Sequence, residues 1–335
     1  MQTSFEKFKV NAKFLLKTLT PTSKNTNWYD PPPENKITQR QIGRLILQFH
    51  QVSNFINQFH DKKKPLKFLD VGTGNGILPE LVSKYCKSKI SHGIDPYEDG
   101  EHKTSWPTGT RPKLMNKIKK ILRSKKLNIK NYKNFLNYEA LSHSPSEIDL
   151  HRNPVKWKFF KKFIHELPIK NKYNFIFAKC IDHISDWNDL FNNISKRAEK
   201  DSIMLIKHNS FFSYNGAHRY ASTFIPWGHV VLNGKKYEKY SKKFHSARSK
   251  KMIDFFYNGL SYPRNTLSEL IEIMHKFNWK IVHLEQSNKK DYQKLLKFAG
   301  GSKKLIENAK KNYPSITLSE MISDRIFLVA KKINK

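Results

Sequence analysis

The stretch FLDVGTGNGILPEL, residues 68–81, forms a glycine-rich, acidic turn with no basic residue, although the chain is strongly basic. Asp70 comes first, and three glycines then alternate with other residues at Gly72, Gly74 and Gly76. Glycine lets the backbone turn tightly and approach a ligand without a Cβ in the way. Asp95 ends the next predicted strand, where an acid accepts hydrogen bonds from ribose hydroxyls. The pattern predicts a turn that binds a ribose-containing ligand.

The charge of this turn argues against a dinucleotide. The nicotinamide dinucleotide fingerprint is G-x-G-x-x-G, and here Gly76 comes one residue too early. Asp70 would repel a pyrophosphate but attract a cationic amino-acid group. S-adenosylmethionine (SAM) carries an ammonium and a sulfonium and no phosphate, so the turn predicts SAM as the cofactor.

Several stretches resemble one family. FLDVGTGNG and GIDPYE resemble motifs I and II of class I SAM-dependent methyltransferases. YNFIFAKCIDHISDW resembles the fourth strand of that family and the loop after it, SIMLIKH the fifth strand, and DRIFLVAKK the seventh. The resemblance spans residues 67–332. It implies a SAM-dependent methyltransferase with an α/β fold, in which a doubly wound, mainly parallel seven-stranded sheet carries helices on both faces.

The resemblance also implies roles for individual residues. The glycine turn and the end of the second strand would hold the methionine and ribose parts of SAM, through Asp70, Gly72, Thr73, Gly74, Gly76 and Asp95. Cys180, Ile181 and Asp182 follow the fourth strand and would lie near the methyl group and the acceptor. An acid that contacts adenine is not evident, because Glu166 is slightly out of place.

A histidine-rich segment, residues 207–230, follows the fifth predicted strand and would face the ligand crevice. It loosely resembles methyltransferases with a G-x-H…PW-x-H pattern, often associated with sugars, glycolipids or small metabolites. We therefore predict a small-molecule or glycan acceptor, methylated at oxygen with a histidine as general base. The candidate catalytic residues are His208, His218, His229 and Asp182. Their spacing fits no standard metal-ligand pattern, so no metal is predicted. For each histidine, the alternative to a catalytic role is a structural one.

Apolar periodicity predicts the elements that position these residues. Strands are predicted at 67–71, 89–94, 173–178, 202–207, 279–284 and 325–330, with a weaker strand pattern within 159–167. Helices are predicted at 38–60, 78–85, 186–197 and 266–277. We predict a helical N-terminal extension over residues 1–64 and the methyltransferase domain over 65–335. Insertions are predicted at about 96–155, 208–265 and 286–323.

The net charge of +34 suggests a second class of acceptor. Residues 111–133 and 234–251 are dense in lysine, and in the second run aromatic residues alternate with lysines, as in surfaces that bind RNA. Compositional drift in the genome explains the same charge. The alternatives to the predicted function are therefore a nucleic-acid methyltransferase and a SAM-binding protein without turnover.

Two cysteines, Cys86 and Cys180, fit a reducing compartment and predict a cytoplasmic protein. No apolar run is long enough to predict a membrane span. The sequence does not specify the acceptor, the atom that is methylated or the oligomeric state.

Overall fold

The computed structural model describes residues 39–74, 76–96, 115–120, 156–214, 216–223, 225–245, 249–288 and 292–333. The basic run at 111–133 and the insertion at 96–155 lie mostly outside the described residues, as does the extension before residue 39. None of the helices in the described ranges is long and apolar enough to cross a membrane.

The described chain forms a seven-stranded mixed sheet in the order β3-β2-β1-β4-β5-β7-β6. The pairs from β3 to β5 are parallel, and β7 runs antiparallel to both β5 and β6. The strands are β1 (Leu66–Val71), β2 (Ser88–Ile94), β3 (Lys158–Phe160), β4 (Tyr173–Ala178), β5 (Ala198–His208), β6 (Trp279–Asn288) and β7 (Ser323–Lys332). This arrangement confirms the predicted fold class.

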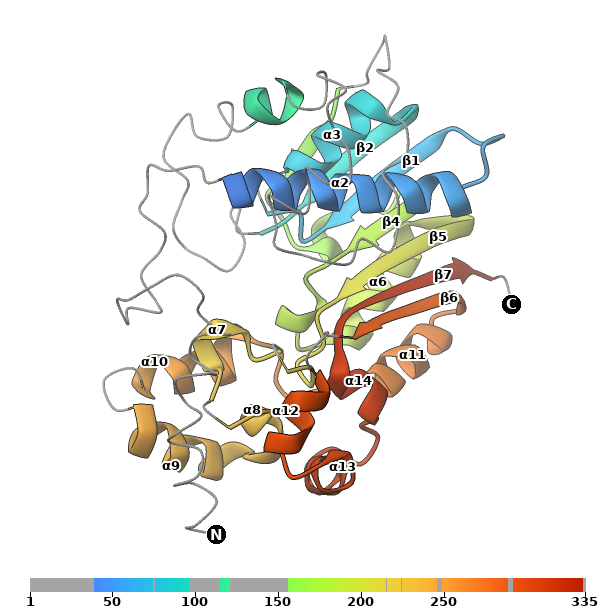
Figure 1. The fold of residues 1–335 in the computed structure, drawn as a ribbon. Helices are drawn as coiled ribbons and strands as arrows, with labels where there is room; N and C mark the ends of the chain where they lie inside the picture. Colours follow the sequence, from blue (N-terminus) through green and yellow to red (C-terminus); the bar gives the residue numbers. More distant parts are fainter. Residues whose placement is uncertain are drawn as a thin grey trace.

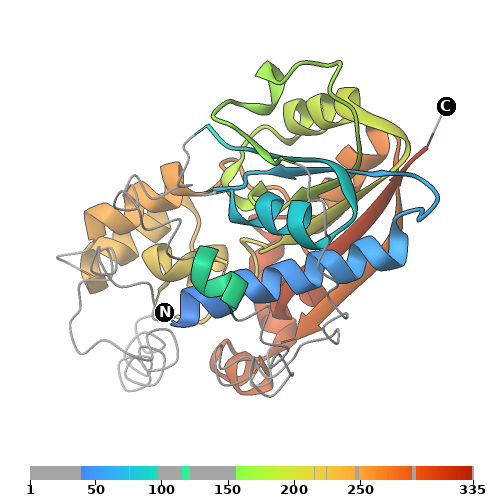
Figure 2. The same ribbon diagram turned by 90° about the horizontal axis from the view of Figure 1, so that it is seen from above.

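Helices cover both faces of the sheet, which lies between them in Figures 1 and 2. On one face, α2 (Gln39–Phe59) and α3 (Ile77–Tyr85) pack against the sheet in a core that includes Phe49, Phe68 and Phe177. On the other face, α6 (Trp187–Arg197) and α11 (Leu267–Lys276) share a second core with β4 and β5. Every residue of β4 is buried, because the strand is covered from both sides.

Local sequence signals fix the starts of two helices that border the site. Asp186 caps α6, since its side chain accepts a hydrogen bond from the Asp189 backbone N–H at 2.8 Å. Thr266 and Glu269 form a capping box at the start of α11, in which each side chain accepts from the backbone N–H of the other. These caps set the residue at which each helix begins.

The segments predicted as insertions at 208–265 and 286–323 pack together into one helical unit, below the sheet in Figure 1. The Trp227 indole N–H donates to the Met321 carbonyl at 2.8 Å, and the Asn312 amide donates to the Val230 carbonyl at 3.0 Å. The helical unit consists of α7 (His218–Ala221), α8 (Gly228–Val231), α9 (Gly234–His245), α10 (Ser249–Asp254), η4 (Phe255–Gly259), α12 (Tyr292–Phe298), α13 (Ser302–Lys310) and α14 (Leu318–Ile322).

Candidate active site

The glycine turn lies between the end of β1 and the start of α3 and is tied to the end of β2. Gly72 N–H and Thr73 N–H both donate to the Ile94 carbonyl, at 2.9 and 3.2 Å. The Gly74 N–H donates to Asp95 Oδ2 at 2.9 Å. Gly72, Gly74 and Gly76 all have φ between 61° and 71°, a left-handed conformation that glycine adopts without strain. The two acids predicted from the motif therefore sit at the same edge of the sheet.

The three glycines differ in what surrounds them. A Cβ at Gly72 would collide with the side chain of Cys180, and one at Gly76 would lie 2.8 Å from the Trp157 ring. A Cβ at Gly74 would meet no atom of the described residues within 4 Å. Protein packing thus requires Gly72 and Gly76 to be glycine, whereas Gly74 faces open space that a ligand can occupy.

Asp70, which precedes the turn, is a buried acid. It is 2% exposed, and within the described part of the chain its Oδ2 has no hydrogen-bond partner. Burial raises the pKa of Asp70 to about 7, and the charge of Asp95 adds to the rise while Thr73 and Lys179 oppose it. A cationic group beside Oδ2 would satisfy this oxygen and stabilise the carboxylate. The turn therefore fits the amino-acid moiety of SAM.

Cys180 and Ile181 follow β4, and Cys180 lies against the glycine turn. The Cys180 Sγ is 3.5 Å from the Val71 carbonyl oxygen, and burial raises the pKa of this thiol far above its usual range. Ile181 is fully buried, and its carbonyl accepts a hydrogen bond from the Trp187 indole N–H at 3.0 Å. The neutral Cys180 thiol and the buried Ile181 side chain pack in the protein interior and position the backbone of this loop. Contacts of these two residues with the cofactor stay a prediction.

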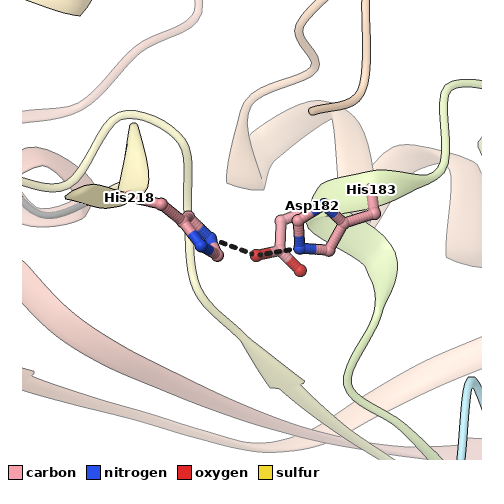
Figure 3. Close-up of side chains that lie close together, drawn as sticks. All are labelled: Asp182, His183 and His218. Carbon is pink, nitrogen blue, oxygen red and sulfur yellow. Dashed lines mark hydrogen bonds and ion pairs between the residues drawn. The ribbon is translucent and has the colours of Figure 1, made fainter. Parts of the chain in front are cut away.

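Asp182 and two histidines form a cluster just beyond the end of β4, shown in Figure 3. Asp182 and His183 belong to the single turn η2 (Ile181–His183), and His218 comes from the start of α7. The His218 Nε2 lies 3.1 Å from Asp182 Oδ2, and the His183 Nε2 lies 3.5 Å from the same oxygen. The parallel strands carry this cluster and the glycine turn to one edge of the sheet.

The charges in the cluster define which nitrogen of His218 can act as a base. Burial by itself would raise the pKa of Asp182, but His183, His218 and His208 hold it at about 2, so the carboxylate is ionised. An ionised carboxylate only accepts hydrogen bonds, and His218 Nε2 must therefore donate. In neutral His218 the lone pair is then on Nδ1. The side chain is 28% exposed and can be reached by a substrate.

The other two predicted catalytic histidines are held elsewhere. His208 is buried at the end of β5 with its ring perpendicular to that of Trp187, and neither ring nitrogen has a hydrogen-bond partner in the described ranges. His229 Nε2 lies 2.9 and 3.1 Å from the carbonyl oxygens of Phe211 and Ser213. Burial lowers the pKa of both histidines to about 4. Of the three, only His218 is hydrogen-bonded to Asp182.

His183 belongs to the cluster but is not among the predicted site residues. Its Nδ1 lies 2.7 Å from the Gly259 carbonyl, and its ring is perpendicular to that of His218, with centroids 5.2 Å apart. The only sequence signal was its position directly after Asp182. The contact with Gly259 joins parts of the chain that are far apart in sequence, and no local pattern predicts it.

The sheet order with its antiparallel β7, the glycine turn and the acid at the end of β2 define a class I SAM-dependent methyltransferase. A family model described as a methyltransferase domain matches residues 39–284, and the chain belongs to this family. It is an enzyme whose methyl donor is SAM. When bound, SAM would lie against the glycine turn, with Asp70 at its amino-acid end and Asp95 at its ribose. No curated protein matches the sequence.

Solved structures of several methyltransferases resemble the chain at low identity. A SAM-dependent methyltransferase from Mesorhizobium loti is 9% identical over 85% of this chain and 100% of that one, with a TM-score of 0.42. Plantazolicin methyltransferase is 15% identical over the whole of both chains, with a TM-score of 0.42. Phosphoethanolamine N-methyltransferase 2 from Haemonchus contortus is 12% identical over 93% and 61% of the two chains, with a TM-score of 0.38. Likenesses this distant carry no information about the acceptor.

Proposed function

We propose that the enzyme methylates a hydroxyl oxygen of a small-molecule or glycan acceptor, with His218 as the general base. The observation that carries the proposal is the hydrogen bond between His218 Nε2 and Asp182 Oδ2, at the sheet edge that also carries the glycine turn. A carboxylate that holds the imidazole by one nitrogen orients the other and stabilises the imidazolium that forms. We assign Asp182 this positioning role.

Methyl transfer needs little from the protein beyond alignment and a place for one proton. When bound, SAM supplies a methyl group on a sulfonium, which is electrophilic. The acceptor oxygen gains the methyl carbon, the carbon–sulfur bond breaks with its electron pair left on sulfur, and the hydroxyl proton passes to His218 Nδ1. Asp182 then balances the positive charge on the ring.

The aromatic residues of the lysine-rich run favour a small acceptor over a nucleic acid. In α9, Tyr237 and Tyr240 are buried in or beside the core of the helical unit, with 0% and 5% of their surface exposed. Bases cannot stack on rings that are buried, although the lysines of this helix are exposed. In the segment before α9, Tyr214 and Trp227 are also buried and pack edge to face. These rings form a core and give no support to the predicted RNA surface.

A label-transfer assay tests the proposal. The enzyme is incubated with methyl-labelled SAM and, in parallel, with a small-molecule extract, a glycan fraction and total RNA. We expect base-stable label in the small-molecule or glycan fraction, lost by roughly a hundredfold or more in His218→Ala, which removes the base. His275→Ala serves as the control, because His275 is an exposed histidine on α11.

Three results would contradict the proposal in different ways. Label found mainly in RNA would favour the nucleic-acid alternative. SAM binding without transfer to any fraction would indicate a SAM-binding protein without turnover. Transfer that His218→Ala leaves unchanged would remove His218 as the base. The cytoplasmic location is not tested by these experiments and stays a prediction from the cysteine content.

A further inference from the structure

Three potential metal ligands converge in the cluster that contains the proposed base. Asp182, His183 and His218 each offer one ligand atom, and these three atoms lie within 4.8 Å of one another. Two ligands at about 2.1 Å from a tetrahedral ion lie roughly 3.4 Å apart. The carboxylate oxygen lies 3.1 Å from one nitrogen and 3.5 Å from the other. The two separations from the carboxylate oxygen are therefore close to those of a tetrahedral site.

The hydrogen bond of His183 prepares its second nitrogen for a cation. The Gly259 carbonyl can only accept, so Nδ1 at 2.7 Å must donate to it. In the neutral ring the lone pair is then on Nε2, which faces a carboxylate oxygen. Two electron-rich atoms face each other there, and a proton or a metal ion between them stabilises the pair. A backbone carbonyl that fixes the tautomer is the usual partner of a histidine that binds a metal.

The carboxylate offers a further observation. The Asp182 side chain is only 2% exposed, and its Oδ1 has no hydrogen-bond partner among the residues that the structure describes. Buried carboxylates are ordinarily satisfied by hydrogen bonds or by a cation. Two imidazole nitrogens and one carboxylate form a donor set that suits zinc or another divalent first-row transition metal, and they leave a fourth position for water.

We propose that Asp182, His183 and His218 form a binding site for a divalent transition metal such as Zn²⁺, and that the metal competes with the base. The ion would bind Nε2 of His218, and the ring proton would then be on Nδ1. Because Nδ1 carries the lone pair that removes the acceptor proton, the metal-bound enzyme lacks its base. The inhibition rests on the proposed function, whereas the metal site stands on the geometry alone.

Calorimetric titration of the full-length protein with Zn²⁺ tests the site. We expect one ion per chain, with affinity lowered roughly tenfold or more in His183→Gln and in Asp182→Asn. His275→Gln replaces an exposed histidine on α11 and should bind zinc as the wild type does. In the label-transfer assay, zinc should inhibit the wild type, and a chelator should restore the rate. His183→Gln should resist inhibition relative to its own metal-free rate.

The outcomes separate the metal site from the base. If the wild type binds no zinc, or if His183→Gln binds it as tightly as the wild type, the site is overturned, and the His218→Ala result still decides the base. If zinc binds to these residues without inhibiting, the competition is overturned and so is His218 as the base. If zinc binds and accelerates transfer, the site is upheld, but the acceptor is activated by the metal and the base assignment fails.

Discussion

The side chain of Cys180 fills the space in which a Cβ on Gly72 would lie. A Cβ built on Gly72 would come 2.2 Å from Cys180 Sγ and 2.5 Å from its Cβ. The contact joins the turn after β1 to the loop after β4, two residues before Asp182. The cofactor turn therefore packs directly against the loop that leads to Asp182.

Replacement of Gly72 by alanine should destabilise the fold. The added methyl group collides with Cys180, and the φ of 71° is unfavourable for alanine. Together these effects should lower the free energy of unfolding by about 2–4 kcal/mol. Urea denaturation measures the loss. Gly74→Ala is the matched control, since its φ of 61° is similar but its Cβ would meet nothing, and it should cost only about 1 kcal/mol. Equal losses in the two variants would show that the Cys180 contact does not matter.

Replacement of Asp70 by asparagine should weaken SAM binding. Asparagine keeps the shape of the side chain but removes the charge that would meet the SAM ammonium. We expect an affinity at least roughly tenfold lower by calorimetry at pH 8, with an unchanged circular dichroism spectrum. Asp254→Asn, an exposed residue on α10, is the control. If Asp70→Asn binds SAM like the wild type, the cofactor assignment of this turn is wrong.

The affinity for SAM should also depend on pH through Asp70. Burial raises the pKa of this carboxyl in the free protein to about 7. Because a cationic ligand binds the ionised form, protons compete with SAM below pH 7, and binding there releases a proton. The affinity of the wild type should therefore fall as the pH is lowered from 8 to 6. The same titration of Asp70→Asn should be flatter, and parallel curves for the two proteins would rule out Asp70 as the titrating group.

The sequence was sufficient for six of the seven strands because these are short apolar runs with a local signal, whereas β3 is only three residues long and only a weak pattern within 159–167 was predicted there. YNFIFA at residues 173–178 was predicted with the bounds that the structure has, and the motif placed Asp70 and Asp95 at one edge of the sheet. The strand β5 is longer than the predicted 202–207, since it begins at Ala198 within a polar stretch that no apolar pattern marks.

Contacts between distant segments could not be predicted in the same way. The helical unit unites two predicted insertions because buried residues such as Trp227 and Met321 meet in one core. The sequence does not distinguish His218 from His229 and His208. The folded structure does, because it hydrogen-bonds His218 to Asp182. The sequence predicted Gly72 as part of a ligand-binding turn. The structure shows that a glycine is also needed there because a Cβ would collide with Cys180.

Replacement of Arg197 by methionine should destabilise the protein strongly. Its guanidinium is buried and donates hydrogen bonds to the backbone carbonyls of Leu167, Asn193 and His165. Methionine fills similar volume but leaves these acceptors without a donor, which should cost about 3 kcal/mol. Thermal and urea denaturation measure the change. Lys196→Met alters the exposed neighbour and should stay within about 0.5 kcal/mol of the wild type. A similarly small effect at Arg197 would show that water replaces its hydrogen bonds.

Glu320 should make the stability of the helical unit depend on pH. It is fully buried, its Oε1 accepts a hydrogen bond from the Ser210 hydroxyl at 2.5 Å, and Oε2 accepts from the Leu267 N–H at 3.0 Å. Burial raises the pKa of Glu320 to about 7, so the folded protein favours the protonated carboxyl.

A folded-state pKa above the unfolded value contributes stability in acid, and this stability is lost as the pH rises through about 7. Glu320→Gln resembles the protonated form and does not ionise. The unfolding free energy of the wild type should therefore fall relative to that of Glu320→Gln between pH 5 and pH 8, by up to about 3 kcal/mol. Urea denaturation across this range measures the difference. Glu272→Gln, an exposed change on α11, should follow the wild type at every pH. If the Glu320→Gln curve runs parallel to the wild type, Glu320 is ionised in the folded protein, and its two hydrogen bonds outweigh the cost of burial.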